Sequence, residues 1–149
     1  MKFYEFLESN KDKEIDIYFD MDGVFAEYDI GNFDYNTIRP IKSNIKVIED
    51  LYNKYNVNIL SICKTNEIVR EKYDWMARYL PFFDKDKMNF ISKEVITGVE
   101  SCDLKSNFLK DNVVEGHITI LVDDDITVIK KIIKDNKDVK VFHVISIVE

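Results

Sequence analysis

Two aspartates one residue apart, Asp20 and Asp22, close an apolar run and stand directly before Gly23. The run, residues 15–19, has the composition of a buried strand. A folding core gains nothing from two acids at the end of such a strand, because like charges this close raise each other's pKa and lose hydration. A cation or a reaction must account for them, and a divalent metal is the simplest answer.

Other polar side chains follow later apolar runs in the same way. Ser61 comes after residues 57–60, and an acidic triplet that begins with Asp123 and Asp124 comes after residues 117–122. Carboxylates from two strand ends form a hard oxygen site that suits Mg²⁺, which binds through few carboxylates together with a substrate phosphate. A hydroxyl and a lysine would add a donor and a positive charge for phosphoryl oxygens. One aspartate can then attack phosphorus while a second protonates the leaving oxygen.

The elements that must position these residues alternate between strand and helix. We expect a short helical lead-in around residues 3–7, strands near 15–20, 57–60, 88–91, 117–122 and 139–145, and helices near 41–55, 66–80, 103–110 and 126–134. This alternation predicts an α/β fold with a parallel sheet and helices on both of its faces. Ligands bind beyond the carboxyl ends of the strands in such sheets. The polar residues above all fall at that edge.

Length and charge narrow the class of protein. The chain has 149 residues and no internal repeat or linker, so we expect one domain over 1–149. Its net charge of -7 argues against tight binding to nucleic acid. No apolar stretch approaches the roughly 20 residues of a membrane span. The two cysteines have no metal-type spacing and indicate free thiols in a reducing cytoplasm.

Three motifs in order resemble the haloacid dehalogenase (HAD) superfamily of phosphatases. They are an apolar strand followed by D-x-D-G-[TV], an apolar strand followed by Ser or Thr, and an apolar strand followed by two aspartates. Here they stand as Asp20-Met21-Asp22-Gly23-Val24, Asn58-Ile59-Leu60-Ser61 and Ile120-Leu121-Val122-Asp123-Asp124. The resemblance covers nearly the whole chain. It implies a three-layer Rossmann-like fold and a Mg²⁺-dependent phosphoric monoester hydrolase that forms an aspartyl-phosphate.

The resemblance also implies catalytic roles. Asp20 would be the nucleophile, and Asp22 would be the general acid and base. Ser61 and a lysine would bind the phosphoryl group. That lysine is expected at Lys105, which opens a short helix before the fourth strand, with Lys93 as the alternative.

The same resemblance implies a metal site made of acids. Asp20 and the backbone carbonyl of Asp22 would hold Mg²⁺ together with Asp124, while Asp123 either binds the ion or orients its waters. Residues 24–40 are irregular and would form a flap or reduced cap over the site. Such a short segment leaves no room for a full cap domain. In a homo-oligomer, a neighbouring subunit could then cover the site instead.

A narrower resemblance concerns the substrate. The motifs are similar to those of 5'(3')-deoxyribonucleotidases, and the closing Asp-Asp-x-x-Thr-Val pattern is similar to the phosphatase half of phage-type polynucleotide kinase. This implies a small phosphorylated substrate, a nucleotide above all, or else the 3'-phosphate of a polynucleotide. Phe25, Tyr28 and Lys64 are the expected substrate contacts.

Several other interpretations stay open at this point. A phosphoaspartate module like a response-regulator receiver uses similar residues, but its acidic pair follows the first strand and its phosphoacceptor the third. A calcium loop would need further acids before Gly23, where position 18 is tyrosine. Asp125 is expected to cap the following helix. His117, His143 and the aromatic residues of 73–79 are expected to pack, and Cys63 to be a buried thiol.

Overall fold

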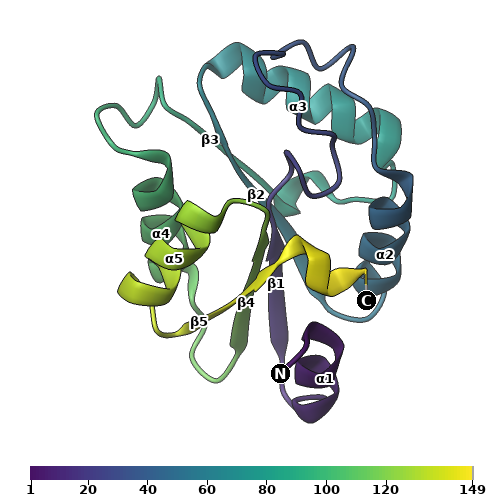
Figure 1. The fold of residues 1–149 in the computed structure, drawn as a ribbon, viewed down its shortest axis with the longest axis vertical. Coiled ribbons are helices and arrows are strands. Elements are labelled where there is room, and N and C mark those ends of the chain that lie inside the picture. Colours follow the sequence, from purple (N-terminus) through teal and green to yellow (C-terminus); the bar gives the residue numbers. More distant parts are fainter. Residues whose placement is uncertain (149) are drawn as a thin grey trace.

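A five-stranded parallel sheet forms the centre of the molecule (Figure 1), as seen in a computed structural model that describes residues 1–148. The strands are ordered β3-β2-β1-β4-β5 across the sheet. Their bounds are β1 (Ile15–Phe19), β2 (Asn56–Cys63), β3 (Met88–Ser92), β4 (Ile118–Asp123) and β5 (Val139–His143). The order places β1 in the middle, between β2 and β4, so the ends of these strands lie side by side.

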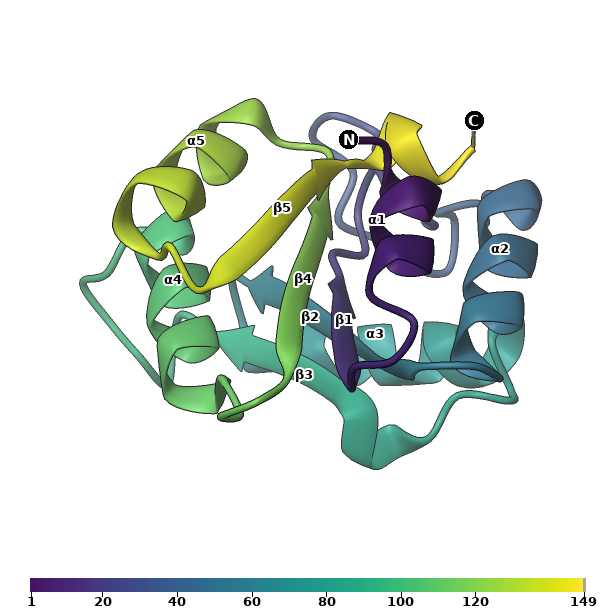
Figure 2. The ribbon, with the colours of Figure 1, turned by 90° about the horizontal axis from the view of Figure 1, so that it is seen from below.

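Helices cover both faces of this sheet (Figure 2), which gives three layers. On one face lie α1 (Phe3–Ser9), α2 (Lys42–Tyr52) and α3 (Asn66–Tyr79), and on the other lie α4 (Ser101–Asn112) and α5 (Ile126–Asp135). Two short 3-10 helices, η1 (Lys85–Lys87) and η2 (Val144–Ile147), precede β3 and follow β5. The α/β Rossmann-like fold expected from the sequence is therefore confirmed.

Alternating side chains of the central strand divide the core into two parts. Ile17 and Phe19 pack with the residues of α1, α2 and α3, whereas Tyr18 packs with Leu109 of α4 and Val128 of α5. This is the period of two that a strand imposes on its side chains. Because both faces are covered, β1 is buried along its whole length. That explains why its sequence reads as a nearly continuous apolar run.

Element boundaries differ from the sequence expectation at a few ends. The second strand does not stop at Ser61 but continues to Cys63. The last strand stops at His143, because the next residues turn into a 3-10 helix that the His143 ring caps by accepting from the amide of Ile145. Asp125 caps α5 by accepting from the Thr127 amide at 2.8 Å, as expected from the sequence.

The irregular segment 24–40 is held to the body of the fold at several points. Its two ends pair, since the Glu27 amide donates to the Arg39 carbonyl and the Ile41 amide donates to the Phe25 carbonyl, both at 2.8 Å. The Trp75 ring N–H of α3 donates to the Ile38 carbonyl at 3.0 Å. This segment is thus a tethered loop against α3, much shorter than a separate cap. Within residues 1–148, no helix combines the length and apolar character that crossing a membrane requires.

Candidate active site

Three carboxylates meet where β1 and β4 end. Oxygen atoms of Asp20, Asp123 and Asp124 all lie within 4.8 Å of one another. The pairing of β1 with β4 aligns Phe19 with Val122, so the residues that follow them are brought to the same level. Asp20 and Asp123 are buried, and Asp124 is partly exposed. Three hard oxygen ligands this close together fit the coordination chemistry of Mg²⁺.

Lys105 is the lysine that faces this cluster. Its Nζ lies 2.8 Å from Asp20 Oδ1 and 2.6 Å from Asp123 Oδ2. Burial lowers the pKa of Lys105, but the two adjacent carboxylates outweigh burial and raise it above its ordinary value. Lys93 lies elsewhere and contacts the Ser101 hydroxyl at 3.4 Å. Of the two lysines expected from the sequence, the structure brings Lys105 to the acids.

Burial and neighbouring charges raise the pKa of two acids of this cluster. Burial raises the pKa of Asp20 to about 7; Lys105 opposes this shift, while Asp123 and Asp22 add to it. Burial, followed by the charge of Asp123, also raises the pKa of Asp124. A bound divalent cation would favour the ionised forms, because an opposite charge at contact distance stabilises a carboxylate.

Asp22 lies outside the three-carboxylate group and is held by two donors that the sequence did not predict. Its Oδ2 lies 2.8 Å from Lys72 Nζ, and its Oδ1 accepts from the Tyr35 hydroxyl at 2.6 Å. Lys72 Nζ also donates to Ser61 Oγ at 2.7 Å. Lys72 is 1% exposed. One buried ammonium therefore links the expected acid–base residue to the expected phosphoryl-binding hydroxyl.

A sequence signal for Lys72 did exist. Lys72 shares the inward face of α3 with Ile68, Trp75 and Met76, at the spacing of successive helical turns. A lysine at a core position of an amphipathic helix needs a buried partner. Tyr35 offered no such signal, because it lies in the irregular segment, where no periodicity tells inward from outward positions.

Gly23 allows the backbone to approach the Asp124 carboxylate of the acidic cluster closely. Its φ is +82°, a conformation that L side chains rarely adopt, and a Cβ at this position would clash with the carboxylate of Asp124. The carbonyl of Met21 accepts from the amides of Val24, Phe25 and Ala26 at 3.1 Å each, which closes the chain into a tight turn. The glycine of the first motif is required by both the turn and the approach of Asp124.

The turn also corrects the expected role of Phe25. Its side chain is fully buried and packs against Trp75, with ring centroids 5.9 Å apart. It is part of the core and offers no surface to a substrate. Tyr28 is 67% exposed, but it lines a separate cavity of about 420 Å³ with residues such as Arg39. Lys64, the third expected substrate contact, does line the pocket beside Asp22.

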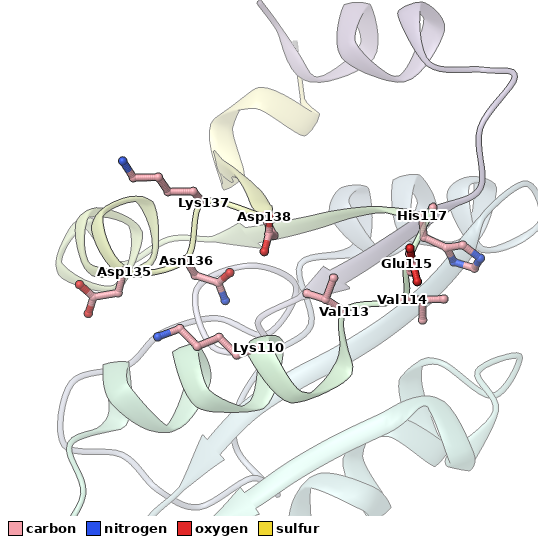
Figure 3. A pocket seen from close by; sticks show the side chains of 10 residues that line it. Lys110, Val113, Val114, Glu115, His117, Asp135, Asn136, Lys137 and Asp138 are labelled. Carbon is pink, nitrogen blue, oxygen red and sulfur yellow. The ribbon is translucent and has the colours of Figure 1, made fainter.

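Two cavities at opposite edges of the sheet differ in their relation to these residues. A small pocket of about 180 Å³ is lined by Asp22, Lys72 and Lys64. A larger cavity of about 700 Å³ lies near the start of β4 and β5, where Figure 3 shows Lys110, His117 and neighbouring side chains around it. The larger cavity contains none of the expected site residues. The small pocket contains two of them, Asp22 and Lys64.

The histidines and cysteines take structural positions. His117 Nδ1 lies 2.9 Å from Asp16 Oδ2, at the amino end of the sheet. His143 caps the last 3-10 helix. Cys63 is a buried free thiol whose pKa is raised by burial. These placements agree with the packing roles expected for them.

No protein-family model and no curated protein matches this sequence. Solved structures do match its fold. A chain of the Pnkp1/Rnl/Hen1 complex superposes with a TM-score of 0.66 at 12% identity, over 88% of this chain and 46% of that chain. The HAD family enzyme BT-2542 from Bacteroides thetaiotaomicron, in complex with magnesium and inorganic phosphate, gives 0.57 at 11% identity, over 87% of this chain and 93% of that one. The HAD domain of effector protein Lem4 from Legionella pneumophila gives 0.52 at 12% identity, over 88% and 84%.

The chain has a HAD-like fold. It spans less than half the length of the Pnkp1-complex chain and most of the two HAD structures. In this HAD-like fold, Asp20, Ser61 and Asp123 stand at or near the carboxyl ends of three adjacent strands. That arrangement is the one expected from the order of the sequence motifs.

Replacing Gly23 by alanine is expected to displace Asp124 from the acidic cluster, in addition to straining the backbone. The left-handed backbone conformation costs an alanine about 1–2 kcal/mol. Gly116→Ala is a matched control, since Gly116 has a φ of +85° but nothing within 4 Å of a Cβ. We expect Mg²⁺ to raise the midpoint of thermal unfolding of wild type and of Gly116→Ala. The midpoint of Gly23→Ala should change little when Mg²⁺ is added. Equal Mg²⁺ responses in the two variants would contradict the proposed approach of Asp124.

The metal-free protein is expected to lose stability as pH rises. Folded Asp20 keeps its proton up to about pH 7, whereas its ordinary pKa is 3.8. Between these values the folded state binds more protons than the unfolded state, so the free energy of unfolding falls with rising pH. Urea denaturation in EDTA at pH 5.5 and pH 8 would measure this. The fall should be smaller in Asp20→Asn than in wild type or in Asp125→Asn, and identical pH dependence in all three proteins would refute it.

The ion pair between Lys72 and Asp22 can be measured by a double-mutant cycle. Lys72→Met leaves a partly buried carboxylate without its cation, and breaking a buried pair costs about 3–5 kcal/mol. Asp22 is 27% exposed in its side chain, so we expect about 3 kcal/mol or less. Adding Asp22→Asn to Lys72→Met should recover part of this loss in urea denaturation. Lys64→Met serves as the exposed control, and strictly additive effects would exclude the coupling.

Proposed function

We propose that the protein is a Mg²⁺-dependent phosphomonoester hydrolase that acts through an aspartyl-phosphate. The observation that carries the proposal is the division of the acids. Asp20 lies against Lys105 within the carboxylate cluster, whereas Asp22 lies apart from that cluster against Lys72 and Tyr35. A nucleophile and a proton donor need different surroundings. A divalent cation at Asp20 would keep the nucleophile ionised, and Asp22 can carry a proton once Lys72 turns to the phosphoryl group.

In the first step, Asp20 attacks the phosphorus of the substrate and the bond from phosphorus to the leaving oxygen breaks. The leaving oxygen takes a proton from protonated Asp22. In the second step, a water molecule gives its proton to Asp22 and attacks the phosphorus of the aspartyl-phosphate. This releases inorganic phosphate and regenerates Asp20 and protonated Asp22.

The buried cations support the charge that builds up on the phosphoryl group. Lys105 and the Ser61 hydroxyl are the proposed donors to its oxygens. Asp20, Asp123 and Asp124, with the backbone carbonyl of Asp22, are the proposed ligands of Mg²⁺. When bound, Mg²⁺ supplies positive charge that draws the phosphoryl group toward Asp20 and lowers the repulsion between two anions.

Both oxygens of Asp22 are engaged in this structure, which has a consequence for the first step. Lys72 and Tyr35 each donate to one of them. Asp22 therefore has to release Lys72 and take up a proton before it can donate that proton to a leaving oxygen. A phosphoryl oxygen of the substrate can replace the Asp22 carboxylate as the partner of Lys72, because each of them can accept a hydrogen bond from its ammonium group.

The substrate we propose is a nucleotide or a similar small phosphorylated metabolite. The sequence motifs shared with 5'(3')-deoxyribonucleotidases support a nucleotide. The short tethered loop in place of a cap favours a second candidate, the 3'-phosphate of a polynucleotide, because an open site admits bulky substrates. The fold match to a chain of an RNA repair complex, Pnkp1/Rnl/Hen1, points in the same direction.

Hydrolysis of p-nitrophenyl phosphate with and without Mg²⁺ tests the proposed activity. We expect Mg²⁺-dependent turnover in wild type and in Asp125→Asn, which keeps its helix cap because asparagine also caps helices. Asp20→Asn should abolish turnover, and Asp22→Asn should lower it by about 10²–10⁴-fold. A panel of nucleotides, sugar phosphates and 3'-phosphorylated oligonucleotides would then identify the substrate. Absence of turnover on the whole panel would overturn the proposal.

The same assay separates hydrolysis from a receiver-like phosphoaspartate module. A hydrolase releases many equivalents of phosphate per chain. A receiver that stores its phosphoryl group would release at most one equivalent of the leaving alcohol and keep the phosphate on Asp20.

A further inference from the structure

The small pocket beside Asp22 is where the leaving group of the substrate would lie. Its lining includes Asp22 and the buried Tyr35 and Lys72, together with the more exposed Phe33, Lys64 and Lys93. In the proposed reaction Asp22 protonates the leaving oxygen, so the atoms attached to that oxygen must extend into the space next to Asp22. The inference below rests on that proposed function.

The charges that line this pocket are unlike those of the chain as a whole. The chain has 28 acidic and 21 basic residues. The pocket lining has three lysines and a single carboxylate, that of Asp22. Since Lys72 is paired with Asp22, Lys64 and Lys93 give the pocket lining an excess of two positive charges.

Neither of these two lysines has an acidic partner among residues 1–148. Lys64 Nζ lies over the ring of Phe33, 4.2 Å from its centroid, and Lys93 Nζ contacts the Ser101 hydroxyl at 3.4 Å. The nearby Glu94 carboxylate accepts from the Asn66 amide at the start of α3. Two ammonium groups without an acidic partner at one pocket attract an anion to it, although the chain as a whole is acidic.

We infer that this pocket binds a second phosphate, carried by the leaving group of the substrate a few bonds from the phosphate that is removed. Its volume of about 180 Å³ is below the roughly 300–1,000 Å³ of pockets that enclose drug-sized ligands. It suits one sugar-sized ring and one phosphate. Phe33, which is 48% exposed, offers an apolar ring face beside the two charges.

Two classes of substrate carry a second phosphate on the leaving group. A nucleoside bisphosphate carries its second phosphate as a free monoester, and the 3'-phosphorylated end of a polynucleotide carries it as the adjacent phosphodiester. Both place a second anion on the sugar whose oxygen leaves. The shared requirement is a second phosphate on the leaving group, and it separates these substrates from nucleoside monophosphates.

Three thymidine compounds test the requirement: thymidine 3'-monophosphate, thymidine 3',5'-bisphosphate and the dinucleotide TpTp with a 3'-phosphate. The measured quantity is kcat/KM for removal of the 3'-phosphate, with products identified by chromatography. We expect wild type to prefer the compounds with a second phosphate, through a lower KM. A preference for the bisphosphate alone indicates a metabolite, and a preference that extends to TpTp indicates a polynucleotide end.

Lysine variants assign the preference to the pocket. Lys64→Ala and Lys93→Ala should each lower the ratio of kcat/KM between the bisphosphate and the monophosphate by roughly threefold to fivefold, the size expected for a partly exposed charge pair. Lys13→Ala, an exposed lysine before β1 at the other edge of the sheet, should leave the ratio unchanged. The ratio should also fall as salt is added. Because each ratio is taken within one variant, a general loss of activity does not affect it.

A binding measurement keeps this inference separate from the proposed activity. Calorimetry with Asp20→Asn and Mg²⁺ compares the affinities of thymidine 3',5'-bisphosphate and thymidine 3'-monophosphate without turnover. Failure of p-nitrophenyl phosphate and of the whole substrate panel would overturn the hydrolase, while the affinity ratio would still decide the pocket. Equal affinities, or a wild-type preference that neither lysine variant reduces, would overturn the second-phosphate site.

Discussion

The structure depends on neutralising carboxylates that are buried at the end of its central strand. Asp20 and Asp123 stand side by side where water is largely excluded, and neither charge is stable there alone. Lys105 lies between them, at 2.8 and 2.6 Å, and is itself buried. Asp20, Asp123 and Lys105 stabilise one another as a group, because a buried ion without its partners is far more unfavourable than the complete group. The position of α4, which carries Lys105, is thereby tied to the ends of β1 and β4.

The parallel sheet supplies the register that this charge group requires. β1 has β4 on one side and β2 on the other, so a residue just beyond β1 meets residues from both neighbours. The backbone of Asp20 donates to the Val122 carbonyl at 3.0 Å, which continues the ladder one step past the assigned strand. Gly23 then reverses the chain without a side chain in the way of Asp124. A shift of one residue in this register would send Asp20 to the other face of the sheet.

The sequence predicts this half of the site well, because its signals are local. A buried strand that ends in polar residues can be recognised within a single segment of the sequence. Three such endings, two acidic and one at Ser61, indicate which edge of a parallel sheet they share. Lys72 and Tyr35 escaped prediction for different reasons. A lysine in an amphipathic helix is usually a solvated residue, and only its position in line with Trp75 and Met76 marks it as buried. Phe25 was assigned to the substrate because it follows the acids, but the turn on the Met21 carbonyl folds it into the core.

Two buried lysines from helices on opposite faces of the sheet hold the two aspartates of the first motif apart. Lys105 comes from α4 and holds Asp20, whereas Lys72 comes from α3 and holds Asp22. Since successive residues of a strand point to opposite faces, a spacing of two would by itself place both acids on the same side. The turn that Gly23 permits breaks this alternation directly after β1, so each acid meets its own cation. The two carboxylates are therefore in different electrostatic surroundings although they are two residues apart. The proposed roles, a nucleophile toward phosphorus and a proton donor to the leaving oxygen, would need two acids that are separated in this way.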